Sequence, residues 1–208
     1  IEFRENEPFN DSLRSKTIQN LNNLDLFSFP SIGYEYLSES DKELSANIFL
    51  NPKKNYGLGF GFDIKQSDIE DIGISFENRF KSRNIFKNGE NLELSAVGSI
   101  GKSNDVTISQ VYFDATLRLP KFIFFGSLNK RFGSDIKSFI SFGSTNQKNI
   151  GLDRTSFRFN LNYAWENKNN FFNFSLSDVE LINNRNINNY FNIYTNSYQQ
   201  LNQIAQNN

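Results

Sequence analysis

In residues 156–166, large apolar side chains alternate without a break with side chains that are polar or, at Ala164, small. The apolar members of this segment are Phe157, Phe159, Leu161, Tyr163 and Trp165. Because successive side chains of a strand point to opposite faces, the pattern predicts a strand with one apolar and one polar face. Its apolar part spans about 30 Å at about 3.3 Å per residue, or about 20 Å of height once the strand is tilted by about 45°. This height nearly matches the apolar band of an outer-membrane barrel, which is about 25 Å tall.

The same period of two recurs along most of the chain from Tyr56 onward. Hairpin-connected strands of this kind are typical of antiparallel sheets and barrels. We predict a mainly β fold: the N-terminal half of a transmembrane, antiparallel, up-and-down β-barrel of about eight strands. These strands are expected at residues 56–64, 72–81, 92–102, 106–119, 122–131, 136–147, 156–166 and 171–182.

Residues 1–53 follow another pattern. Asn10 and Asp11 are good N-cap residues, and apolar residues from Leu13 to Leu24 recur at spacings of three and four, which predicts an amphipathic helix. We expect Phe29-Pro30 to end it, followed by a hairpin with strands at residues 32–37 and 44–50. Residues 1–53 are thus predicted to form a small α+β domain, residues 54–182 the barrel half, and residues 183–208 a loop or tail without a clear period.

Composition removes several classes of function. The net charge is -1 and the chain has no strongly basic run, so nucleic acid is not an expected partner. The chain has no Cys and no His, so disulfides and the usual general base, thiol nucleophile and zinc ligands are missing. We therefore expect no enzyme, no cofactor, no metal and no catalytic residue. The densest acidic group, Asp68, Glu70 and Asp71, is interpreted as a solvated loop, with a calcium site as the alternative.

Two further features bear on the class of protein. No apolar run reaches the length of a transmembrane helix, and the mean hydropathy of -0.54 is uninformative for a barrel with a polar lumen. A chain that begins at Ile1 without an initiator Met is expected to be a processed product or, as we favour, a piece of a longer protein.

A soluble antiparallel sandwich is the main alternative, with the apolar face as its core and the polar face in solvent. The aromatic density on one face favours the barrel. The polar face also has fewer Lys and Glu residues than a soluble surface usually carries. In the barrel, the polar positions would face the lumen; the candidates are Arg118, Arg158, Asn160, Asn162 and Glu166.

Several local motifs carry a family resemblance. The helix contains Thr17-Ile18 and Leu21-Asn22-Asn23-Leu24, the hairpin ends in Asn51-Pro52, and a Gly-alternating strand follows. The most specific motif is the turn made by Arg83, Asn84, Ile85, Phe86, Gly89 and Glu90, with Lys87 where the family turn has Gly. Over roughly residues 1–182 the chain resembles the last POTRA domain and the first barrel half of the Omp85 superfamily. It is most similar to TamA-like proteins of Bacteroidetes-type bacteria and more distantly to BamA.

The resemblance implies a location and a function. The barrel would lie in the bacterial outer membrane of a Gram-negative cell with the N-terminal domain in the periplasm, and would insert outer-membrane proteins or move polypeptides across that membrane. The implied partners are outer-membrane lipid, unfolded outer-membrane protein clients, the remainder of the barrel, and periplasmic or membrane partner subunits. A weak first strand would form a lateral gate that receives client strands; its residues are Gly57, Leu58, Gly59, Phe60, Gly61 and Phe62.

Alternatives stay open at this point. The glycines of the first strand could relieve crowding in the lumen rather than form a gate. The N-terminal domain could be a passive spacer rather than a binding module. For the whole chain, the alternatives are a passive channel and a soluble all-β binding domain.

Overall fold

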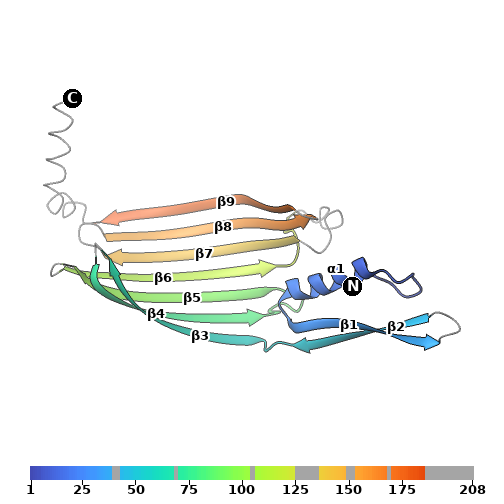
Figure 1. The fold of residues 1–208 in the computed structure, drawn as a ribbon. Coiled ribbons are helices and arrows are strands. Elements are labelled where there is room, and N and C mark those ends of the chain that lie inside the picture. The colour runs from blue at the N-terminus through green and yellow to red at the C-terminus, as the bar shows by residue number, and fades with distance from the viewer. Residues whose placement is uncertain are drawn as a thin grey trace, which may run out of the picture.

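The computed structural model describes residues 1–38, 43–67, 70–103, 106–124, 136–148, 153–167 and 170–185. They form a mainly β structure with one helix and two antiparallel sheets (Figure 1). Within these ranges, no helix has both the length and the apolar character needed to cross a membrane. The larger sheet has seven strands in the order in which they follow one another in the chain. They are β3 (Tyr56–Ser67), β4 (Glu70–Arg83), β5 (Asn91–Ser103), β6 (Val106–Leu119), β7 (Ile136–Lys148), β8 (Asp153–Asn167) and β9 (Asn170–Arg185).

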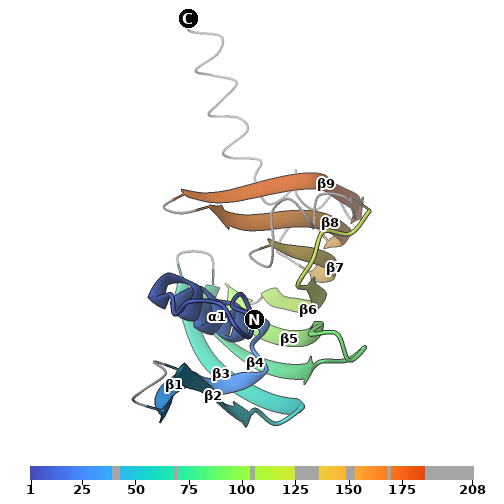
Figure 2. The same cartoon turned by 90° about the vertical axis from the view of Figure 1, so that its right-hand side faces the viewer.

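The seven-stranded sheet is curved and open. Figure 2 shows it bending around the side on which the helix lies. In the described part of the chain, β3 and β9 are its edges and no strand joins them. The expected barrel wall is therefore present as a curved sheet, and a closed barrel is not.

The register assigns the two faces of this sheet. Phe62 pairs with Phe76 and Phe142 pairs with Phe159, so their side chains share the outer, convex face. The intervening residues, such as Arg158, share the inner, concave face. The predicted alternation is thus realised as an apolar outside and a polar inside.

The N-terminal segment contains α1 (Asp11–Leu24), β1 (Phe27–Ser38) and β2 (Glu43–Pro52). Asn10 caps the helix as predicted, because its side chain accepts from the backbone N–H groups of Ser12 and Leu13. The hairpin prediction is also confirmed, since β1 and β2 pair antiparallel. In Figure 1 this segment lies at the end of the large sheet where β4 and β6 finish.

One local prediction in this segment was wrong. The helix ends at Leu24, and Phe29-Pro30 lies inside β1 instead of terminating the helix. The pairing of β1 with β2 shifts between Ser28 and Ser31, and Phe29 has a φ of 52°. A Phe-Pro pair marks an irregularity in the backbone, but its local sequence does not separate a bulge from a helix stop.

A second correction concerns residues 122–131, which were predicted to be a strand. No strand includes the described residues 121–124, and residues 125–131 lie outside the described ranges. Pro120 lacks a backbone donor and Phe124 has a φ of 68°, so neither continues a ladder. The described sheet therefore has seven strands where about eight were expected.

The predicted domains are only partly visible. The N-terminal segment has one helix and a two-stranded sheet, so a POTRA domain is not evident in it. The division at residues 53 and 54 stays a prediction. Of the predicted tail at residues 183–208, residues 183–185 belong to β9, and the remainder lies outside the described ranges.

Candidate functional site

The predicted gate residues occupy the edge strand β3. Leu58, Phe60 and Phe62 project from the outer face and are 73%, 70% and 64% exposed. Gly57 and Gly59 alternate with them and pair with Lys81 and Arg79 of β4. In the described part of the chain, β3 pairs with β4 alone, so its other edge offers backbone donors and acceptors.

The glycines of β3 are not demanded by packing. A Cβ at Gly59 would lie 3.6 Å from the Cβ of Arg79, and one at Gly61 would lie 3.4 Å from the Cβ of Glu77. Both are ordinary van der Waals distances, and neither glycine has a positive φ. Among the described residues, therefore, a side chain at either position would meet ordinary contacts only, and glycine weakens an edge strand.

The predicted turn motif forms the connection between β4 and β5. The backbone N–H of Ile85 donates to the Glu90 carbonyl at 3.0 Å, and Asn84 Oδ1 accepts from the backbone N–H of Gly89 at 2.8 Å. Glu90 is 2% exposed, and its carboxylate accepts from the backbone N–H of Asn88 at 3.0 Å. Phe86, by contrast, is exposed. The turn is thus closed by its own polar side chains.

Gly89 is the one turn position where the fold requires glycine. Its φ is 90°, and a Cβ there would lie 3.0 Å from Leu24 Cδ2 and 3.3 Å from Pro120 Cγ. The turn therefore packs against both the end of α1 and the start of the β6–β7 connection. Lys87 also has a positive φ, 65°, which a lysine adopts only at an energetic cost.

The C-terminus of α1 is held over the concave face by an ion-pair cluster centred on Asp25, which we call the latch. Asp25 Oδ1 lies 2.5 Å from Lys53 Nζ, and its Oδ2 lies 2.7 Å from Lys81 Nζ and 3.6 Å from Arg83 Nε. Burial opposes ionisation of this carboxyl, but hydrogen bonds from Lys53 and Lys81, together with their charges, lower the pKa of Asp25 to about 2. The carboxylate is therefore charged at neutral pH.

Further side chains of the sheet reach the same helix end. Asn91 Nδ2 donates to the Leu24 carbonyl at 3.0 Å, and Lys137 Nζ donates to Asn23 Oδ1 at 2.8 Å. Arg118 donates to the Asn23 carbonyl. The last turn of α1 has no basic residue of its own. Cations on β6 and β7 thus face the negative end of the helix dipole.

Sequence reasoning missed this cluster. Asp25, Lys81 and Lys137 were not among the predicted site residues. One available signal was that Lys81, Arg83, Arg118 and Lys137 all lie near the same end of their strands, opposite a helix end that lacks a cation.

All five predicted lumen residues lie on the concave face, and they make different contacts. Arg118 contacts the end of α1, and Glu166 Oε2 accepts from Gln19 Nε2 of the same helix at 3.0 Å. Arg158 lies farther along the sheet, where its Nη2 is 3.5 Å from the Tyr112 hydroxyl. Asn160 and Asn162 lie between Arg158 and Glu166 on β8.

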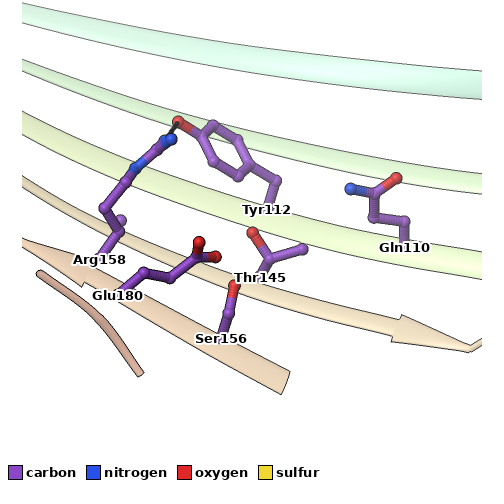
Figure 3. A pocket seen from close by; sticks show the side chains of 7 residues that line it. Gln110, Tyr112, Thr145, Ser156, Arg158 and Glu180 are labelled. Atoms are coloured by element: carbon purple, nitrogen blue, oxygen red, sulfur yellow. Dashed lines mark hydrogen bonds between the residues drawn. The ribbon is translucent and has the colours of Figure 1, made fainter. Parts of the chain in front are cut away.

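A polar hollow surrounds Arg158. It is lined by Gln110, Tyr112, Gly143, Thr145, Ser156, Arg158 and Glu180, which come from β6, β7, β8 and β9. Figure 3 shows Arg158 directed toward the Tyr112 hydroxyl, with Glu180 between Arg158 and Ser156. The hollow contains one cation, one carboxylate and several hydroxyl or amide groups. It could therefore order water or a small polar ligand. The side chains that line it are not arranged as a nucleophile and a base.

The acidic group considered as a calcium site is only partly described. Glu70 and Asp71 begin β4, and Asp68 lies outside the described residues. Within the described ranges, no group of three or more Asp and Glu side chains is arranged to hold a metal ion.

Comparison with known proteins yields structural likenesses but no match by sequence. No family model matches the chain, and no curated protein matches it. Among solved structures, the chain is similar to "The crystal structure of BamA from Haemophilus ducreyi lacking POTRA domains 1-3" with a TM-score of 0.36 and 9% sequence identity. The matched region covers 86% of this chain and 43% of that chain, so this chain spans less than half of the BamA structure.

Proposed function

We propose that this chain forms part of the wall of an outer-membrane β-barrel. The observation that carries the proposal is the exposure of large apolar side chains on the convex face, from Tyr56 and Phe60 on β3 to Leu181 on β9. A water-soluble monomer rarely exposes apolar patches larger than a few hundred Å². A barrel in lipid requires such an outer face around a polar interior. The N-terminal segment would then lie in the periplasm.

The strand directions constrain how such a barrel closes. Neighbouring strands of the seven-stranded sheet are antiparallel, so β3 and β9 run in the same direction. Direct pairing of these two edges would be parallel. An antiparallel barrel therefore requires an odd number of further strands between β9 and β3.

The proposed activity is outer-membrane protein insertion or polypeptide translocation, with client strands docking on β3. A client strand would add to the free edge by backbone hydrogen bonding, in which side-chain identity matters little. Gly57, Gly59 and Gly61 weaken the strand without being needed for packing, which suits a seam that opens and reseals.

The substitution Gly59→Val in the full-length protein tests this activity. A β-branched side chain stiffens the strand and raises its β propensity, so insertion of client barrel proteins should fall several-fold. Gly98→Val on β5 is the control, because a Cβ at Gly98 meets nothing within 4 Å and β5 is paired on both sides. Unchanged insertion in the Gly59→Val strain, at normal expression of the protein, would contradict the gate.

For the N-terminal segment, we propose client or partner binding along the free edge of β2. Ser45 and Asn47 lie on this strand, which pairs with β1 alone in the described residues. Photocrosslinkers at Ser45 and Asn47 should capture clients or partner subunits. A passive spacer would give no adducts from either position.

A passive channel is the second candidate. The polar hollow around Arg158 and Glu180 favours it, because charged side chains on a barrel's inner face set ion selectivity. Depletion of the protein separates the two activities. Loss of an insertion factor lowers the amounts of other barrel proteins in the membrane, whereas loss of a channel changes permeability alone.

A further inference from the structure

The connection that follows β6 turns back onto the outer face of the sheet. We call its described residues Lys121, Phe122, Ile123 and Phe124 the strap. Lys121 accepts at its carbonyl from Ser138 Oγ at 2.5 Å, and Ile123 accepts at its carbonyl from the Tyr163 hydroxyl at 3.1 Å. Two of the strap's carbonyls are therefore hydrogen-bonded to side chains of β7 and β8.

The strap covers apolar residues that would otherwise face outward. Phe122 is 8% exposed, and its ring lies 5.0 Å from that of Tyr163 and 6.1 Å from that of Trp165. Tyr163 and Trp165 have the same strand parity as Phe157 and Phe159, which are exposed on the outer face. The buried apolar cluster therefore lies on the outer face of the sheet, opposite the face that α1 contacts. Its members are Phe122, Ile136, Leu161 and Tyr163.

The strap lies at one end of the outer apolar surface. It contacts the ends of β7 and β8 that are nearest the α1 segment, whereas Phe157 and Phe159 continue the apolar surface along β8 away from it. Trp165 also stacks on Phe172 of β9, with ring centroids 5.2 Å apart and planes at 12°. Aromatic rings that gather at the end of an apolar band are typical of the boundary between lipid chains and headgroups.

The backbone chemistry of the strap fits that boundary and not the hydrocarbon layer. A non-regular segment cannot satisfy all of its backbone N–H and C=O groups internally, and each unsatisfied group in hydrocarbon costs several kcal/mol. In the headgroup layer, water can donate to the C=O groups, and both water and phosphate oxygens can accept from the N–H groups. Lys121 is exposed there, and Phe124 is 80% exposed with its backbone held at a φ of 68°.

We propose that the strap is a membrane-interface anchor whose partner is the headgroup and acyl boundary of a phospholipid bilayer. Phe124 inserts among the upper acyl carbons, and Lys121 contacts lipid phosphates. Phe122 keeps acyl chains away from Tyr163 and Trp165. This inference rests on the proposed membrane location. It adds which residues make one contact with the bilayer and how deep in the bilayer they lie.

Trp165 reports on this contact, because it is the single tryptophan of these 208 residues. The full-length protein, with any tryptophan outside these residues replaced by Phe, is refolded into phosphatidylcholine vesicles that carry a spin-label quencher either close to the glycerol backbone or close to the acyl chain end. Quenching of Trp165 should be about twofold stronger with the shallow quencher. A Phe124→Cys variant of this cysteine-free chain, labelled with an environment-sensitive dye, should also be quenched most by the shallow lipid.

The substitution Phe122→Ser gives a second test of the anchor. Loss of the covering ring should let acyl chains reach Trp165, so the ratio of shallow to deep quenching should fall. Phe142→Ser is the matched control, because Phe142 is an exposed outer-face residue of β7 outside the strap. It should leave the ratio unchanged.

The outcomes separate the strap from the membrane proposal. If the protein does not float with vesicles and no lipid quencher acts on it, the proposed membrane location fails. If it floats with vesicles while Trp165 and position 124 escape both quenchers, the strap contacts water or protein and the anchor is wrong. Equal or deeper quenching of Trp165 in the unaltered protein would also overturn the anchor.

Discussion

Strands β3 and β8 share one sequence pattern and differ in what surrounds them. Both alternate apolar and polar residues, yet the apolar side chains of β3 from Tyr56 to Ile64 are 64–73% exposed. On β8, Tyr163 is 1% exposed because the strap covers it. β8 also has two paired neighbours, whereas β3 has one in the described part of the chain. The alternation therefore sets which face a side chain occupies, and the coverage of that face depends on distant segments.

This difference also separates a stable part of the wall from a weak one. β8 combines two ladders, a covered aromatic cluster and a hydrogen bond from α1 to Glu166. β3 combines one ladder with three glycines that make no tight contact. If a strand of this sheet opens to receive a client, β3 is the strand whose release breaks the fewest contacts.

Truncation of the covered aromatic should have the largest effect. Tyr163→Ala removes a ring of β8 that is buried under the strap, and should lower the free energy of unfolding by about 3–5 kcal/mol. Phe60→Ala on β3 should lower it by about 0.5 kcal/mol or less, because the ring is already exposed. Urea unfolding of the protein refolded in detergent micelles measures both. Equal losses would abolish the contrast between the two strands.

Removal of the charge on Asp25 should have a smaller effect that depends on pH. The pKa of Asp25 is about 2 in the folded protein against an ordinary value of 3.8. The latch therefore contributes its full stabilisation above about pH 4, by about 1–2 kcal/mol, and loses it as the pH falls toward 2. Asp25→Asn keeps a residue that tolerates the αL backbone and should remove this stabilisation at neutral pH.

The latch prediction sharpens the contrast because two of its cations lie on β4, the neighbour of β3. Hydrogen exchange should therefore quicken in β3 and β4 of the Asp25→Asn protein more than in β8. A difference in stability between the two proteins that persists unchanged at pH 2 would show that the charge of Asp25 is not the cause.

The smallest expected change is a gain. Lys87 has a φ of 65° in the turn between β4 and β5, and Lys87→Gly should raise the free energy of unfolding by about 1 kcal/mol. Asn88 has no positive φ, so Asn88→Gly should bring no such gain. Thermal unfolding of the two variants compares them directly. A loss of stability in Lys87→Gly would mean that the lysine makes a contact that offsets its backbone cost.

Local patterns in the sequence predicted the regular elements well. The period of two predicted the positions of the strands from β3 to β9, because a strand with one apolar and one polar face has an alternating sequence. Asn10 and the apolar spacing that follows it predicted α1 for the same reason. The glycine at position 89 also meets a local requirement, since the backbone there has a φ of 90°.

Contacts between distant segments could not be read from the sequence. The strap depends on Tyr163 and Ser138, which lie on two other strands, and residues 122–131 alone resemble one more strand. The latch joins Asp25 to Lys81, and Asn91 donates to the Leu24 carbonyl across a separation of 67 positions. Each of these contacts requires the register of the whole sheet, which alternation does not determine.

The central claim, that the convex face of this sheet meets lipid, is tested most directly at two adjacent positions of β3. Phe60→Cys and Gly61→Cys, each labelled with an environment-sensitive dye in a chain that otherwise has no cysteine, place the dye on opposite faces. In vesicles that contain a quencher-bearing lipid, the dye at position 60 should be strongly quenched and the dye at position 61 should not. Equal quenching at the two positions, or none at either, would contradict the claim.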